Sequence, residues 1–229
     1  MSLAVIAPML NEERYVKAWC ENVIRYADEV AVMDTGSTDD TYRILARYGV
    51  YICRAAERSE VAVRNHLLAW AQKRSDWILR LDADELMIAE DVLALKQELP
   101  YIKERFIFVP HLMFWRHSDM LRARQYDRHI EKARQFHPCY LPLFWKNDSR
   151  VQYVPYRGRT GWDSRMVYGN WGRIGPRLFG TRREKPAMFH YHFLEHRADR
   201  LQAEEFNEDG IRCVTYTGPH PEEVKYHVR

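Results

Sequence analysis

Three carboxylates lie within four residues of one another, because Asp82, Asp84 and Glu85 follow directly after the apolar run 77–81. Carboxylate oxygens are the ligands that hard divalent cations prefer, Mg²⁺ and Mn²⁺ above all. In a strand, residues i and i+2 point to the same face, so Asp82 and Asp84 can share one metal while Ala83 points away. A solvated turn uses the same residue types, so the motif needs support from the rest of the chain.

Polar motifs also follow the first two apolar runs of the chain. Residues 8–12 read Pro-Met-Leu-Asn-Glu, and residues 34–41 read Asp-Thr-Gly-Ser-Thr-Asp-Asp-Thr. A third pair, Arg64 and Asn65, lies early in a predicted helix. The carboxyl ends of parallel strands form the ligand crevice of an open α/β sheet. We therefore expect the strand-end motifs to meet at one edge of a sheet.

Strands and helices alternate through the first hundred residues. Short apolar runs predict strands, and apolar residues at helical spacing predict amphipathic helices. The predicted strands cover 3–8, 29–33, 50–53 and 77–81, and the predicted helices cover about 13–27, 37–48 and 59–73. Ser37 followed by Asp40 resembles a capping box at the start of the second helix. This order predicts an α/β fold with a mostly parallel sheet and helices on both faces.

The pattern is less regular after residue 91. It predicts a helix over 92–99, strands over 106–110 and 187–193, and a charged helix over 195–209. Proline, glycine and tryptophan recur between 138 and 186, which predicts short strands and loops. Without repeats or a clear linker, the sequence predicts one domain, 1–229, with a less regular C-terminal half.

The net charge of +3 is unevenly distributed over the 229 residues. Residues 101–185 carry 18 basic and 7 acidic side chains, a net charge of +11, and are also rich in aromatic rings. Such a surface suits phosphates and rings, whether of a nucleotide, a lipid diphosphate, a sugar or a nucleic acid. The alternative is that these arginines cover apolar surface or pair with the acidic first half.

Composition also bears on the compartment. No stretch reaches the roughly 18–20 apolar residues of a membrane span, and the short apolar N-terminus predicts a first strand rather than a signal peptide. The four cysteines, which show no Cys-x-x-Cys spacing, are Cys20, Cys53, Cys139 and Cys213. We therefore expect no zinc site or disulfide framework, and a reducing cytoplasm as the location.

Taken in order, the four motifs of residues 8–84 resemble the family 2 glycosyltransferases, which have the GT-A nucleotide-sugar fold. The resemblance covers about residues 3–90, and the stretch 34–41 is specific by itself. It implies a donor half over 1–100 that binds a nucleotide-diphosphate sugar and an acceptor half over 101–229. It also implies a divalent cofactor, Mn²⁺ or Mg²⁺, and favours a UDP-sugar as the donor.

The resemblance assigns donor-side roles position by position. Pro8, Asn11 and Glu12 match the loop that flanks the nucleotide, with the acidic residue near the ribose. Asp34 matches the carboxylate that hydrogen-bonds the base. Gly36 matches the turn after Asp34, and Arg64 matches the basic residue near the base and diphosphate. Asp82 matches the carboxylate near the ribose, and Asp84 matches the metal ligand.

The acceptor side departs from the best-known family pattern, because no Glu-Asp pair stands where the general base is expected. The late stretch 189–193, Phe-His-Tyr-His-Phe, instead resembles the smaller branch typified by lipopolysaccharide-core transferases. If His190 and His192 share one strand face, both can join the metal shell, since imidazole suits Mn²⁺. Asp163, an acid beside Trp162 in a basic segment, is our candidate base.

The resemblance implies an inverting hexosyltransferase-type enzyme that acts on a saccharide or lipid-linked saccharide. The basic segment 101–185 keeps open a second acceptor, a nucleic acid or modified base. A non-catalytic nucleotide-sugar or glycan-binding module of the same fold is a further alternative. We expect a cytoplasmic protein without a transmembrane segment, with peripheral membrane contact still compatible with the sequence.

Overall fold

The computed structural model describes residues 1–55, 59–123, 139–155, 164–169, 180–194, 212–215 and 218–223. Its helices, with one 3₁₀ turn, are α1 (Glu13–Val23), α2 (Thr41–Leu45), α3 (Glu60–Ala71), α4 (Ala89–Glu98) and η1 (Leu99–Tyr101). Its strands are β1 (Leu3–Met9), β2 (Glu29–Asp34), β3 (Tyr51–Arg54), β4 (Trp77–Arg80), β5 (Glu85–Met87), β6 (Phe106–Ala123), β7 (Cys139–Lys146), β8 (Val151–Pro155), β9 (Ser164–Tyr168), β10 (Gly180–Arg182), β11 (Met188–Leu194) and β12 (Arg212–Thr215).

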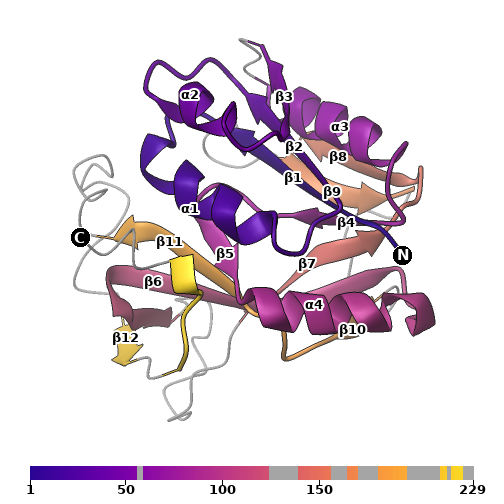
Figure 1. The fold of residues 1–229 in the computed structure, drawn as a ribbon. Coiled ribbons are helices and arrows are strands. Elements are labelled where there is room, and N and C mark those ends of the chain that lie inside the picture. Colours follow the sequence, from indigo (N-terminus) through magenta and orange to yellow (C-terminus); the bar gives the residue numbers. More distant parts are fainter. Residues whose placement is uncertain are drawn as a thin grey trace.

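One sheet joins strands from both halves of the chain (Figure 1). Its order is β3-β2-β1-β4-β7-β6-β11-β5, while β10 and β12 pair with β6. The strands β3, β2, β1 and β4 run parallel, so the carboxyl ends of β2, β1 and β4 meet at one edge. Of the nine strand pairings described in this sheet, five are parallel.

Strand alternation places helices on both faces of the sheet, as predicted. Leu3, Val5 and Ala7 of β1 face one core, which α1, α2 and α4 cover. Ala4 and Ile6 face the other core, which α3 and the β8–β9 hairpin cover. Because both faces of β1 are buried, its sequence is a continuous apolar run and not an alternating one.

The predicted elements of the first half are all present, with boundary shifts of a few residues. The capping box predicted for Ser37 and Asp40 is wrong. The helix α2 begins only at Thr41, and Ser37 Oγ accepts a hydrogen bond from the Asn11 backbone N–H instead. A contact between two loops therefore overrides the local capping pattern.

The second half deviates more from the prediction. The strand predicted over 106–110 extends from Phe106 to Ala123, because β7, β11 and β12 pair with it along its length. The strand predicted over 187–193 is β11, which lies between β6 and β5. The helix predicted over 195–209 lies outside the described residues.

Candidate active site

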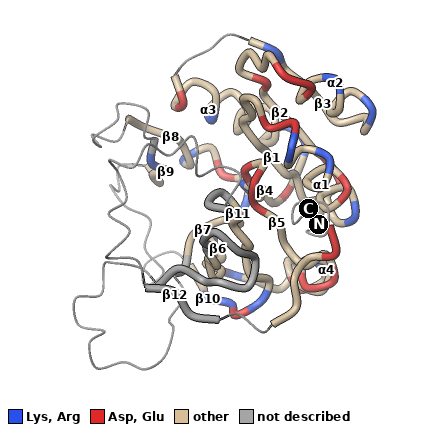
Figure 2. Tube along the Cα trace, turned by 90° about the vertical axis from the view of Figure 1, so that its left-hand side faces the viewer, with Lys and Arg blue, Asp and Glu red and all other residues tan. Residues whose placement is uncertain are grey.

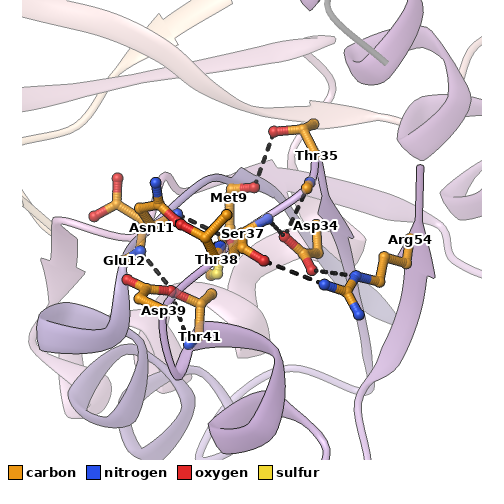
Figure 3. A network of polar contacts seen from close by, with 11 residues as sticks. Met9, Asn11, Glu12, Asp34, Thr35, Ser37, Thr38, Asp39, Thr41 and Arg54 are labelled. Atoms are coloured by element: carbon orange, nitrogen blue, oxygen red, sulfur yellow. Dashed lines mark hydrogen bonds and ion pairs between the residues drawn. The ribbon is translucent and has the colours of Figure 1, made fainter. Parts of the chain in front are cut away.

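The loops after β1 and β2 bind each other through a dense polar network (Figure 3). The Asn11 N–H donates to Ser37 Oγ at 2.9 Å, and Asn11 Oδ1 accepts from the Thr38 N–H at 2.8 Å. Asn11 adopts a φ of +56°, a left-handed conformation that Asn tolerates better than most residues. The Glu12 N–H completes the network by donating to Thr41 Oγ1 at 2.7 Å. The two loops therefore hold one fixed shape.

Asp34 is the centre of this network and is fully buried. Its Oδ1 accepts from the Ser37 N–H at 2.8 Å and from the Gly36 N–H at 3.3 Å. Its Oδ2 lies 3.2 Å from Nε of Arg54, an exposed residue at the end of β3. Gly36 has a φ of +106°, which a residue with a Cβ rarely adopts, so glycine is required by the turn itself. The turn and the ion pair together fix the Asp34 carboxylate.

Asp82 forms a bidentate ion pair with Arg64. Arg64 Nη1 and Nη2 donate to the two Asp82 carboxylate oxygens at 3.2 and 3.1 Å, and Arg64 Nε donates to Glu60 at 2.6 Å. Burial opposes ionisation of Asp82, but the positive charges of Arg64 and Arg80 outweigh it and lower its pKa. Asp82 therefore stays ionised at the end of β4.

Asp84 faces a histidine from the far end of the chain. The Oδ2 atom of Asp84 lies 3.4 Å from Nε2 of His190, and both side chains are largely buried. Tyr191 N–H donates to the Asp84 carbonyl at 2.9 Å, so β11 holds the turn that carries the carboxylate. Burial lowers the pKa of His190, but the carboxylate of Asp84 outweighs it and the pKa is raised.

Glu85 and His111 extend this cluster. Glu85 Oε2 accepts from the Asp82 N–H at 2.8 Å, and burial together with the Asp82 charge raises the pKa of Glu85. His111 Nε2 lies 3.0 Å from His190 Nδ1. Ligand atoms of Glu85, His111 and His190 lie within 4.8 Å of one another. The end of β4 therefore gathers carboxylates and imidazoles in one buried group.

Helix α1 fixes the turn on which these carboxylates lie. Trp19 Nε1 donates to the Leu81 carbonyl at 3.0 Å, just before Asp82. Asn22 Nδ2 donates to the Met87 carbonyl at 2.8 Å, just after Glu85. Because both flanks of the turn are bonded to one buried helix face, the carboxylates are held in place before any ligand binds.

The residues present fit a divalent cation. The carboxylates of Glu60 and Asp82 pair with Arg64, and that of Glu85 lies 3.8 Å from Arg80. Figure 2 shows acidic residues in red beside the labels of β4 and β5. The oxygen of Asp84 and the nitrogen of His190 form a donor pair that suits Mn²⁺. The close packing of the carboxylates and this donor pair both favour a bound cation.

The structure brings most of the predicted donor residues to one edge of the sheet. Pro8 is half-buried and lies in β1, where it pairs with Met33 of β2. The strand ends one residue later, and the loop of Asn11 and Glu12 follows. Asp163 lies outside the described residues, and of His192 only the backbone is described. The register shifts between His190 and Phe193, so strict alternation does not carry through His192, which stays a predicted ligand.

Sequence reasoning missed two residues of the site. Arg54 and His111 had no motif around them, although a histidine inside the apolar run 106–114 is an unusual residue there. Asn65, which the sequence left without a role of its own, bonds the backbone N–H and carbonyl of Tyr153, both at 2.8 Å. Its side chain attaches the hairpin of β8 and β9 to α3.

The comparison with protein families agrees with this arrangement of strand-end loops. The model of "Glycosyl transferase family 2" matches residues 4–140. The chain belongs to glycosyl transferase family 2. The match covers the whole donor edge, from β1 through the Asp82–Glu85 turn and on to the start of β7.

One solved structure shares its fold with this family 2 chain, and others align less well. TarS from S. aureus (residues 1–349) aligns with a TM-score of 0.55 at 14% identity, over 83% of this chain and 60% of that one. Its complex with UDP-GlcNAc aligns at 0.46 and 17% identity, over 64% and 46%. Glucosyl-3-phosphoglycerate synthase from Mycobacterium tuberculosis with Mn²⁺ and UDP aligns at 0.40 and 21%, over 49% and 44%.

The family 2 chain is shorter than these neighbours, since it spans 28% to 60% of the TarS chains it matches. No curated protein matched the chain. Among the described residues, none of the helices has the length and apolar character needed to cross a membrane.

Proposed function

We propose that this chain transfers a sugar from a nucleotide-diphosphate donor, most favourably a UDP-sugar, to a saccharide or lipid-linked saccharide. The observation that carries the proposal is the meeting of Asn11, Asp34 and Asp82–Asp84 at the ends of three adjacent parallel strands, with His190 beside Asp84. Family membership supports the same reaction class, and so does the crystallisation of TarS, which shares the fold, with UDP-GlcNAc.

The donor half, 1–100, has a role for each group. Pro8, Asn11 and Glu12 at the end of β1, with Asp34 and Gly36 at the end of β2, form the base and ribose side, where a few fixed polar groups select the ligand. Arg64 supplies positive charge near the diphosphate while it holds Asp82 in place for the ribose. Asp84 and His190 hold the cation, with His192 as a further ligand.

The chemistry requires charge neutralisation and a base. An oxygen of the acceptor attacks the anomeric carbon, the bond from that carbon to the diphosphate oxygen breaks, and a carboxylate takes the hydroxyl proton. Asp163 is our candidate for that base in the acceptor half, 101–229. A divalent cation at Asp84 and His190 would neutralise the charge that develops on the diphosphate.

The acceptor class depends on what the basic segment does. Five of its described basic side chains bind acids or carbonyls within the chain: Arg105 and Arg150 on Asp148, Arg183 on Glu98, Lys185 on Asp91, and Lys146 on two carbonyls. This pairing favours a saccharide acceptor over a nucleic acid. By its resemblance to the lipopolysaccharide-core branch, the late His-Tyr stretch, 189–193, favours an acceptor of that type. The location that we propose is cytoplasmic, with peripheral membrane contact.

The deciding experiment measures donor binding and turnover. Thermal shift against UDP-, GDP- and TDP-sugars, with Mn²⁺, with Mg²⁺ and with EDTA, is expected to show stabilisation by a UDP-sugar only when the metal is present. Slow release of UDP from that donor would separate an enzyme from a binding module. Absence of metal-dependent binding to every donor would contradict the proposal, and steeply salt-dependent duplex binding would revive the nucleic-acid acceptor.

A further inference from the structure

We propose that His111 is a positioning residue, which keeps the proton of His190 on Nδ1 and so leaves the Nε2 lone pair for the cation beside Asp84. The inference rests on the proposed function, because that function makes His190 a cation ligand. It adds a residue from β6, outside every motif of the donor site, to the control of that ligand.

The geometry of the two rings indicates a hydrogen bond between their edges. The facing nitrogens, His111 Nε2 and His190 Nδ1, are 3.0 Å apart. The ring centres are 5.1 Å apart and the ring planes differ by 24°. The centre separation exceeds the nitrogen separation by 2.1 Å, close to two ring radii, so both nitrogens lie near the line joining the centres. The two rings therefore meet edge to edge, in nearly one plane.

Sheet register brings these rings together. Met188 of β11 pairs with His111 of β6, and His190 pairs with Met113 two residues on. Residues two apart on a strand share a face, so His111 and His190 are diagonal neighbours on one face of the sheet. On its other side His190 pairs with Glu85 of β5. The imidazole thus lies between a carboxylate-bearing strand and the strand that carries His111.

The tautomer decides what His190 can bind. A neutral imidazole has one N–H, so one of the two facing nitrogens must donate and the other must accept. If His190 Nδ1 donates to His111, its Nε2 carries a lone pair towards Asp84 and can bind a cation. If His111 donates, the N–H of His190 is on Nε2 and points to Asp84 Oδ2, 3.4 Å away. Outer hydrogen bonds of this kind commonly fix metal-binding histidines.

A rival arrangement uses the same residues as ligands. Ligand atoms of Glu85, His111 and His190 are close enough to hold a cation by themselves. If the two facing nitrogens, His111 Nε2 and His190 Nδ1, are the imidazole ligands in that arrangement, both must carry lone pairs. Glu85 already accepts from the Asp82 N–H, which ties one of its oxygens to the turn. The two arrangements therefore predict opposite protonation of His190 Nδ1.

The first test reads the tautomer without metal. Long-range ¹H–¹⁵N NMR of the metal-free full chain, at a pH above the pKa of His190, identifies which nitrogen carries the proton. We expect the proton on Nδ1 in wild type and in His111→Gln, whose amide keeps a polar partner at this distance. In His111→Leu the carboxylate of Asp84 is expected to draw it to Nε2. A proton on Nε2 in wild type would overturn the proposal.

The second test measures the affinity for Mn²⁺ alone, by electron paramagnetic resonance titration. His111→Leu is expected to weaken binding about 10- to 100-fold, His111→Gln to stay close to wild type, and Asp84→Ala and His190→Ala to abolish binding. His66→Leu, an exposed histidine on α3, serves as the matched control and is expected to bind like wild type. Circular dichroism and urea midpoints check that every variant is folded.

The outcomes separate the two proposals. If Asp84→Ala abolishes Mn²⁺ binding but His111→Leu binds like wild type, the role of His111 is refuted and the proposed function stands. If His111→Gln loses binding as completely as His190→Ala, His111 is itself a ligand and the positioning role is refuted. If wild type binds no Mn²⁺, both the cation site of the proposed function and the role of His111 are refuted. Should His111→Leu not fold, the wild-type tautomer and His111→Gln still decide.

Discussion

Two regions lie at the same edge of the sheet but satisfy their polar groups in different ways. One is the pair of loops after β1 and β2, called the base-side loops from their proposed role, and the other is the turn of residues 82–85, called the acidic turn. In the loops, side-chain oxygens accept hydrogen bonds from backbone N–H groups: Asn11, Ser37 and Thr41 from the neighbouring loop, and Asp34 from its own loop (Figure 3). At the turn, the carboxylates of Asp82, Asp84 and Glu85 instead lie beside charged side chains, the guanidinium groups of Arg64 and Arg80 and the imidazole of His190.

This difference suggests that the two regions recognise a ligand in different ways, one by its shape and the other by its charge. Backbone N–H groups cannot change their charge, so the base-side loops present one rigid shape to a ligand. Burial raises the pKa of Glu85 and the nearby Asp82 carboxylate raises it further, and a bound cation would relieve that repulsion. We infer that the base-side loops recognise a ligand by fit and the acidic turn by charge, and four experiments test the comparison.

The largest effect is expected from Asp84→Ala. It removes the carboxylate beside His190 without touching the backbone bond that Tyr191 makes to residue 84. Metal-dependent turnover is expected to fall about 10³-fold or more, because charge on the departing diphosphate is no longer neutralised. Glu98→Gln, at an exposed pair with Arg183, is the control. UDP release with and without Mn²⁺ provides the measurement, and wild-type activity in Asp84→Ala would remove the central assignment.

The next effect concerns stability at the acidic turn. Arg64→Met leaves the Asp82 carboxylate without its two-pronged partner in a largely buried place, and the free energy of unfolding is expected to fall by about 3 kcal/mol. Adding Asp82→Asn should recover part of that loss, because the uncompensated charge is gone. Arg43→Met, in an exposed pair, should leave urea midpoints unchanged. Equal effects in Arg64→Met and Arg43→Met would show that the turn is not held by charge.

A third pair of variants separates shape from charge in the base-side loops. Asp34→Ala leaves the Gly36 and Ser37 N–H groups without an acceptor, which is expected to cost about 2 kcal/mol of unfolding free energy. Asp34→Asn keeps an acceptor oxygen and is expected to cost less, while it still weakens UDP binding. Urea unfolding and calorimetric titration with UDP measure the two effects. Equal destabilisation in both variants would mean that the ion pair of Asp34 with Arg54 stabilises the loop more than the hydrogen bonds to the backbone do.

The smallest effect is expected at the ion cluster around Asp148, which lies outside both regions and serves as a reference. Hydrogen bonds from Arg150 lower the pKa of Asp148 to about 2, so the native state binds its proton less tightly than the unfolded chain. Its contribution is therefore full above the unfolded pKa of about 3.9 and lost as pH falls through about 2. Asp148→Asn is expected to cost about 1 kcal/mol at pH 7, since Arg150 is exposed and screened. Urea unfolding at pH 7, 4 and 2.5 checks it, and a difference that does not shrink in acid would contradict it.

Much of the donor half could be predicted from the sequence, because its signals are local. Apolar runs give β1, β2 and β4, and the strand-end motifs follow them directly. One local prediction did not hold, because of a tertiary contact. Ser37 accepts a hydrogen bond from the Asn11 N–H rather than capping a helix. A short polar side chain takes whichever N–H group the fold brings to it.

The second half was less predictable, because its pairings join distant residues. The length of β6 depends on β11 and β12, which follow it by more than sixty residues along the chain. The edge-to-edge bond of His111 and His190 requires the register of those strands, and no spacing in the sequence indicates it.

The sequence alone determined the family resemblance, the parallel donor strands and the Asp82–Ala83–Asp84 turn at their carboxyl ends, since each depends on residues close together in the chain. Only the tertiary structure decided what surrounds that turn. Arg64 binds Asp82, His190 faces Asp84, and His111 lies behind His190, because a carboxylate or an imidazole is partnered by whatever the sheet places within about 3 Å. That placement is a property of strand order and register, which contacts along the whole chain fix together.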